Sequence, residues 1–171
     1  MITPDYCLMM ARYSRWQNRA VIAAADRLDP AARRKPRGAL WGSIAGTLSH
    51  LLWGDLVWLS RFDGGPRPEV GMADSPQAFD DWDEWRRERQ ATDARMVDWA
   101  RALAVADLAG DLYWYSAVQG RAVSRPKALC VAHFFNHQTH HRGQVHAMLT
   151  AAGARTEDSD LLAMPDEADW M

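Results

Sequence analysis

The chain has 171 residues, of which 48% are hydrophobic and 25% are charged, the balance of an ordinary globular protein rather than a disordered chain. Its 20 basic and 22 acidic residues leave a formal net charge of −2, so no excess of positive charge favours a nucleic acid or an anionic membrane surface as a partner. No apolar run approaches the ~20 residues of a membrane-spanning helix and the first residues lack a signal-peptide pattern, so we expect one cytoplasmic domain over residues 1–171.

The first part of the sequence predicts two long helices. Thr3 and Pro4 provide an N-cap and a proline at the first helical position, and apolar residues then recur every three or four positions. The basic, proline-containing stretch 31–38 is typical of a loop. A second helix is expected to begin at Ser43 and to end at the Gly-Gly-Pro sequence 64–66.

The middle of the chain predicts a third helix and a short hairpin. Ser75 and Pro76 repeat the cap-and-proline signal, and a helix starting there is expected to reach Leu103, although its centre at 86–95 is largely polar. Aromatic and β-branched residues then flank a Gln-Gly pair within 112–123, a pattern that favours two short strands.

The last long helix is predicted from Arg125-Pro126 to Ala152, with Gly153 as its stop. Besides its histidines it carries an apolar stripe that we expect to face a second copy of the chain, formed by Val131, Phe134, Phe135, Val145 and Leu149. The tail is expected to wrap over the helices and includes Asp158, Asp160, Glu167 and Trp170. The sequence therefore predicts an all-α fold: a homodimeric four-helix bundle with a long crossover connection and a possible hairpin between its last two helices.

The two cysteines, Cys7 and Cys130, lie within apolar helical patterns. They have neither CxxC spacing nor the density of cysteines typical of secreted, disulfide-bonded domains. We expect both to be buried thiols.

Five of the six histidines lie close together on the last predicted helix, at His133, His137, His140, His141 and His146. Residues four apart on a helix are separated by about 40° around its axis, so His137 and His141 project side by side. Two imidazoles placed in this way can reach one metal ion at ~2.0–2.1 Å. His50, on the apolar side of the second helix, is the predicted third ligand. The alternative is a group of hydrogen-bonded core or surface histidines without an ion.

Four side chains near the histidine pair are candidates for supporting a ligand or lining a cavity: His133, His140, Arg142 and Gln144. The two histidines are also alternative ligands, and the arginine and glutamine are equally well explained as structural groups or as substrate contacts. His146 is on the opposite face of the helix, where solvent or an interface is expected. Asp55 and Asp160 are candidate carboxylates for orienting a ligating imidazole.

The run NHQTHHRGQ at 136–144, followed by Met148-Leu149 and Ala152-Gly153, resembles the signature of the DinB/YfiT-like metal-binding four-helix bundle family. Further matches lie along the chain at Tyr13, Trp16, Asn18, Leu48-Ser49-His50, Trp58-Leu59 and Asp160-Leu161-Leu162. The resemblance covers nearly the whole chain in order. It implies that His50, His137 and His141 are the metal ligands, that water or substrate completes the coordination, and that the protein is a dimer.

Members of this family are similar to thiol-dependent transferases and isomerases, so the resemblance implies a metal-dependent reaction of a small thiol such as bacillithiol, mycothiol or glutathione. The alternatives are a non-catalytic metal-binding or stress-response module and a metal-dependent hydrolase. No glutamate stands beside the histidines as in HExxH, which weighs against the hydrolase. Zinc or nickel is expected first, with iron or manganese as alternatives, because several divalent ions accept imidazole ligands.

Overall fold

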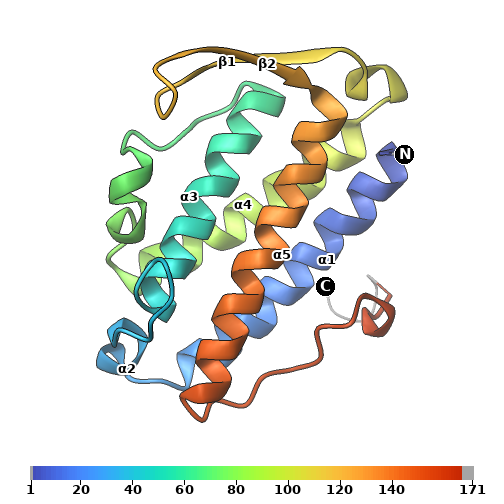
Figure 1. Ribbon diagram of the computed structural model, residues 1–171. Coiled ribbons are helices and arrows are strands. Elements are labelled where there is room, and N and C mark those ends of the chain that lie inside the picture. The colour runs from blue at the N-terminus through green and yellow to red at the C-terminus, as the bar shows by residue number, and fades with distance from the viewer. Residues whose placement is uncertain (1, 167–171) are drawn as a thin grey trace.

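A computed structural model describes residues 2–166 and shows long helices lying side by side, with a small sheet across one end (Figure 1). The long helices are α1 (Pro4–Asp26), α3 (Ile44–Asp63), α4 (Trp82–Ala102) and α5 (Lys127–Ala151). The shorter elements are α2 (Pro30–Arg34), β1 (Asp111–Ser116), β2 (Arg121–Pro126) and the 3₁₀ helices η1 (Met72–Gln77), η2 (Val105–Leu108) and η3 (Leu161–Ala163). The prediction of a mainly helical fold with one hairpin is confirmed.

Capping contacts confirm the predicted starts of the first two long helices and the predicted end of the second. Thr3 Oγ1 accepts a hydrogen bond from the Tyr6 amide at 3.1 Å, and Ser43 Oγ accepts one from the Gly46 amide at 3.0 Å. Gly64 ends α3 in the left-handed conformation, with φ at 74°, which a residue with a side chain rarely adopts.

Two expectations about local structure were wrong. The stretch 31–38 is not all loop, because the Asp29 carboxylate caps the short helix α2 through the Ala32 amide. The third long helix begins at Trp82 rather than near Ser75, because Asp81 supplies its cap. Ser75 lies instead in η1, where its side chain contacts another part of the chain.

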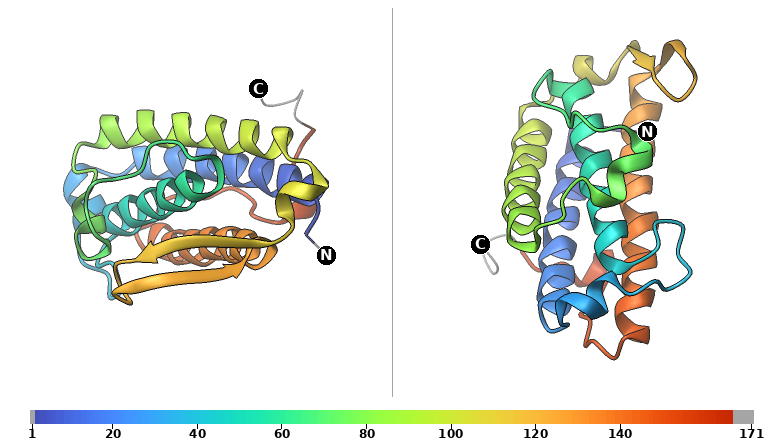
Figure 2. Two further views of the ribbon diagram at one scale, coloured as in Figure 1. Left: turned by 90° about the horizontal axis from the view of Figure 1, so that it is seen from above. Right: turned by 90° about the vertical axis from the view of Figure 1, so that its left-hand side faces the viewer.

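The strands β1 and β2 pair antiparallel and lie across the end of α3 on the way to α5, as Figures 1 and 2 show. Gly120, with φ at 63°, makes the tight turn between them. The ring of Trp114 in β1 contacts the ring of Trp58 in α3, with 5.7 Å between their centroids. The hairpin predicted from its aromatic residues is therefore confirmed, and it is held against α3.

The core consists of two apolar clusters, one at each end of the long helices. Toward the α2 end it includes Val21, Ile22, Leu48, Leu52, Trp85, Val145 and Leu149. Toward the hairpin it includes Cys7, Ala11, Leu59, Met96, Val131, Phe134 and Phe135. The stripe on the last helix that we expected to face a second chain belongs to these two clusters, so that expectation was wrong. The four long helices bury it among themselves.

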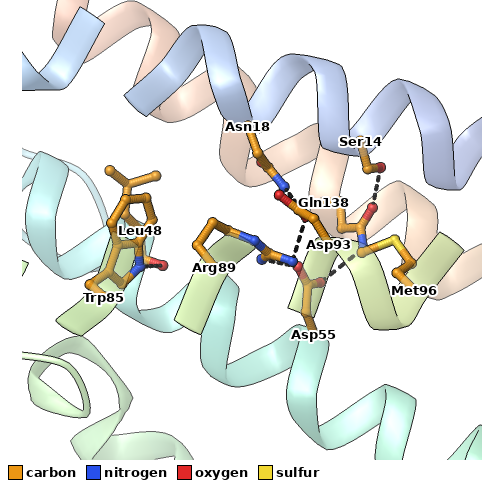
Figure 3. Close-up of polar contacts among 9 residues, drawn as sticks. All are labelled: Ser14, Asn18, Leu48, Asp55, Trp85, Arg89, Asp93, Met96 and Gln138. Atoms are coloured by element: carbon orange, nitrogen blue, oxygen red, sulfur yellow. Dashed lines mark hydrogen bonds and ion pairs between the residues drawn. The ribbon is translucent and has the colours of Figure 1, made fainter. Parts of the chain in front are cut away.

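A layer of buried polar side chains separates the two clusters (Figure 3). This polar layer consists of Ser14, Asn18, Asp55, Arg89, Asp93 and Gln138. Arg89 pairs with Asp55 and, at 2.8 Å, with Asp93. Gln138 Nε2 donates to Asp55 Oδ1 at 3.0 Å and Asn18 Nδ2 donates to Asp93 Oδ1 at 2.8 Å. The layer joins all four long helices and accounts for the polar centre of α4.

Cys7 and Cys130 are buried and form no disulfide, as predicted. Burial raises the pKa of the Cys7 thiol to about 11. This side chain therefore stays protonated at neutral pH and packs as a small apolar group.

The segment after α5 runs back along α1, as expected for the tail. The Tyr13 hydroxyl donates to the carbonyl oxygen of Ser159 at 2.7 Å, and Gln17 Nε2 donates to that of Asp158 at 3.0 Å. The expected contributions of Glu167 and Trp170 lie outside the described residues. Among the described helices, none has the length and apolar character needed to span a membrane.

Candidate metal centre

The structure brings His50, His137 and His141 together between α3 and α5. One possible ligand atom from each lies within 4.8 Å of the others. The ring centroids are 4.4 to 5.3 Å apart. His50 and His141 are buried and His137 is partly buried. The two histidines spaced four apart on α5 and the third on the facing helix α3 therefore point to one place, as predicted.

The separation of two ring nitrogens matches a shared ion. His50 Nε2 and His137 Nε2 are 3.3 Å apart. Two imidazole nitrogens that bind one tetrahedral ion at ~2.0–2.1 Å are themselves about 3.3 Å apart. The donor set also fits, because neutral imidazole is a ligand for several divalent metals.

Ser75 sets the tautomer of His50. Its hydroxyl hydrogen is donated to the carbonyl oxygen of Met72 at 2.6 Å. The same oxygen lies 2.7 Å from His50 Nδ1, so it accepts a hydrogen bond from that nitrogen. His50 Nε2 is therefore left with its lone pair directed at the other two histidines. The sequence marked Ser75 only as a helix cap, because nothing local shows that η1 returns to α3.

Gln144 plays the corresponding part for His141. Its Oε1 lies 2.8 Å from His141 Nδ1 and accepts a hydrogen bond, which leaves the Nε2 lone pair free. Of the four side chains predicted to support the ligands, Gln144 is therefore one that forms a hydrogen bond with a histidine of the cluster. Its position three residues after His141 places both side chains on one face of the helix.

On its Nδ1 side, His137 is held by shape rather than by a hydrogen bond. Within the described part of the chain its buried Nδ1 has no hydrogen-bond partner. The ring lies over Gly54, where an added Cβ would come within 2.8 Å of His137 Cε1. A glycine at this place in α3 therefore makes the space that the imidazole occupies.

Two tryptophan rings pack against His50. The Trp41 ring stacks on His50 with 3.8 Å between centroids, and the Trp53 ring lies 5.8 Å from that of His50. These contacts restrict the His50 ring and shield it from water. A shielded, pre-oriented group of imidazoles loses little conformational freedom when it binds an ion.

His133 and His140 flank the cluster but are exposed. The His133 ring lies 5.9 Å from that of His137 and 5.1 Å from that of Trp58. The His140 ring lies 4.9 Å from that of His141. Neither belongs to the group of three whose ligand atoms converge. Both lie where walls of the site were expected.

The remaining candidates lie elsewhere. Arg142 is buried on the side of α5 that faces α1, with its guanidinium 5.4 Å from the ring centroid of Tyr13. Asp55 belongs to the polar layer, and the Nδ1 partners of His50 and His141 are a serine and a glutamine, so the expectation that Asp55 or Asp160 orients an imidazole was wrong. His146 lies away from the three histidines, 3.4 Å from Thr156 Oγ1 of the tail.

Burial keeps the three imidazoles neutral. Desolvation, with a smaller effect of His141, lowers the pKa of His50 to about 4. Desolvation and the neighbouring histidines lower the pKa of His137 to about 3, and burial also lowers the pKa of His141. All three rings therefore present lone pairs at neutral pH, as metal ligands must.

The family model described as "DinB family" matches residues 1–170. The chain belongs to the DinB family. No curated protein and no solved structure matches it significantly. The matched region includes both helices that carry the three histidines. The cluster of histidines makes this DinB family protein suited to bind a divalent metal ion.

Acid should destabilise the metal-free protein because of these histidines. Their pKa values are lower in the folded state than the ordinary 6.5, so the unfolded chain binds more protons once the pH falls below 6.5. The stability they contribute is complete above pH 6.5 and is lost as the pH falls toward 4. Thermal unfolding of the metal-free protein from pH 8 to pH 4 measures this loss. A His137→Ala variant should show a shallower decline, and identical slopes would contradict the assignment.

Changing Gly54 to alanine should weaken metal binding about 10–100-fold, the loss typical when a ligand's support is disturbed. The new Cβ would push against the His137 ring, as its 2.8 Å approach shows. Helix content should not fall, because alanine is the better helix former. Gly143→Ala in α5 is the matched control, since its added Cβ would meet nothing within 4 Å. Equal metal affinity of the two variants, measured by competition with a chelator, would refute the role of Gly54.

Proposed function

We propose that this DinB family protein is a single domain, residues 1–171, whose long helices form a four-helix bundle around one divalent metal ion held by His50, His137 and His141. The observation that carries the proposal is the convergence of three imidazole rings. Ser75 sets the tautomer of His50 and Gln144 that of His141. Zinc or nickel is the expected ion, with iron or manganese as alternatives.

Three protein ligands favour a reactive site over a structural one. Structural zinc sites have four protein ligands, whereas catalytic sites have three and leave a position for water or substrate. Among the described residues the cluster contains three histidines and no carboxylate or thiol. When bound, the ion would supply a Lewis acid that lowers the pKa of a coordinated thiol or water.

We propose that the ligand activated in this site is a low-molecular-weight thiol, and that the protein is a thiol-dependent transferase or isomerase. Family membership supports this choice. The chain's own part is to keep three imidazoles neutral and oriented, and to shield one side of the site with Trp41 and Trp53. Hydrolysis is less well supported, because the buried carboxylate of Asp55 is engaged by Arg89 and Gln138 and is not free to act as a general base.

Cobalt-substituted protein tests the thiol proposal. Addition of bacillithiol, mycothiol or glutathione should produce a thiolate-to-metal absorption band with at least one of the three. The His137→Ala variant should give no band. Absence of a band with all three thiols, in protein shown to contain cobalt, would favour a non-catalytic metal-binding or stress-response role or hydrolysis.

We also propose a homodimer, on the basis of the family resemblance alone. The apolar stripe on α5 no longer supports it. The exposed apolar side chains of the described residues that a partner could cover include Tyr113, Tyr115 and Val118 of the hairpin. A mass near the 19.3 kDa of one chain in light scattering would contradict the dimer.

A further inference from the structure

A second cavity of about 370 Å³ lies away from the histidines, where the ends of α3, α4 and α5 meet β1. Pockets that bind small organic ligands have about 300–1,000 Å³. Most of its lining is apolar and consists of Phe62, Trp99, Leu103, Leu108, Leu112 and Val131. None of the three histidines lines it, so a ligand here would be bound independently of the metal.

The two acidic residues of this cavity already have partners. Asp63 accepts hydrogen bonds from Arg95 Nε at 2.8 Å and from Arg95 Nη2 at 2.7 Å. Asp107 accepts one from the backbone amide of Ala104 at 2.8 Å. Asp63 is thus paired with the positive charge of Arg95, whereas Asp107 keeps its negative charge. With Arg61 and Lys127, the lining is left with one positive charge in excess.

The two basic residues of the cavity are Arg61 and Lys127. The Arg61 guanidinium lies against two indole rings, 4.5 Å from the centroid of Trp58 and 5.0 Å from that of Trp114. Within the part of the chain that the structure describes, neither side chain has a carboxylate partner. The aromatic rings hold the guanidinium in place by cation–π contacts that leave its in-plane N–H donors unused.

We propose that this cavity binds a small organic acid with an apolar body. The carboxylate lies at Arg61 and Lys127, and the aliphatic or aromatic body packs on the apolar wall. A planar guanidinium binds a carboxylate through two parallel hydrogen bonds, and the apolar lining gains free energy by excluding water from the body of the ligand. Arg61 follows His50 by about three turns of α3, or ~16 Å along the helix axis, and the lining of the cavity contains none of the three histidines.

Titration calorimetry of the metal-free protein with 4-phenylbutyrate and with 4-phenylbutanol tests the proposal. The two probes share an apolar body and differ in charge. We expect the acid to bind about 10–100-fold more tightly than the alcohol, the range for hydrogen bonds to a charged group. This comparison uses the unaltered chain and does not depend on the folding of any variant.

Arg61→Gln should lower the affinity for the acid by a similar factor and leave that for the alcohol unchanged. Arg27→Gln is the matched control, because Arg27 is exposed and does not line the cavity. His137→Ala should bind the acid like the unaltered protein. The proposal would be overturned if the acid did not bind, or if acid and alcohol bound with equal affinity. It would also be overturned if Arg61→Gln left the affinity for the acid unchanged or if His137→Ala abolished binding of the acid.

Discussion

Changing His50, His137 or His141 to alanine is expected to remove most of the metal affinity. Each change leaves two imidazoles, and the loss should exceed the roughly 10–100-fold that follows removal of a residue supporting a ligand. The helices should persist without the ion, because a bundle of this size has enough core to fold alone. The melting temperature of each variant should be lower than that of the metal-loaded unaltered protein, because the free energy of metal binding no longer stabilises the folded state. Metal content after dialysis and melting temperature, measured on each variant, check this result.

The same helix provides graded controls for these variants. His146→Ala should retain the metal, since His146 contacts the tail rather than the cluster. His140→Ala should show an intermediate loss, because its ring contacts that of His141. A His50→Ala variant that holds as much metal as the unaltered protein would show that α3 and α5 do not share an ion.

Changing Arg89 to methionine should cost about 3–5 kcal/mol of unfolding free energy. Arg89 is fully buried between Asp55 and Asp93, and its removal leaves two buried carboxylates without their counter-charge. Burial raises the pKa of both carboxyl groups, and the Arg89 guanidinium opposes this rise. Urea unfolding at neutral pH measures the loss.

Arg86→Met on the same helix is the matched control for Arg89→Met. Arg86 forms ion pairs at 3.6 Å and 3.5 Å with Asp26 and Asp83 at the surface, where such pairs contribute about 0–1 kcal/mol. Similar losses in the two variants would contradict a structural role for the polar layer.

Local signals in the sequence predicted the ends of most helices correctly. Thr3, Ser43 and Gly64 act within one turn of their own position, so a cap can be recognised without knowledge of the fold. Ser75 shows the limit of this reasoning. It has the sequence context of a cap, yet its side chain is directed at His50, because the path of the chain after α3 brings η1 back against that helix.

The histidine cluster could be predicted because its main signal is a spacing within one helix. His137 and His141 need only the geometry of α5, and His50 needs only that α3 faces it. Gln144 was within reach, being three residues from His141. The role of Gly54 could not be predicted, because no pattern in the sequence shows which glycine of α3 lies under an imidazole of another helix.

The polar layer also depends on contacts between distant residues. Residues 86–95 looked like a weak part of a helix, because the partners of Arg89 and Asp93 lie on α1 and α3. The apolar stripe on α5 was assigned to a second chain for a related reason. A helix with histidines on one face and apolar residues on another does not reveal that helices of the same chain cover both.

X-ray absorption spectroscopy of the metal-loaded protein, purified without a histidine tag, tests the central claim most directly. One ion per chain with three imidazole ligands is the predicted result, and His50→Ala loaded with excess metal should show two. A sulfur ligand from the protein, fewer than three imidazoles in the unaltered chain, or a spectrum unchanged in His50→Ala would contradict a metal centre shared by His50, His137 and His141.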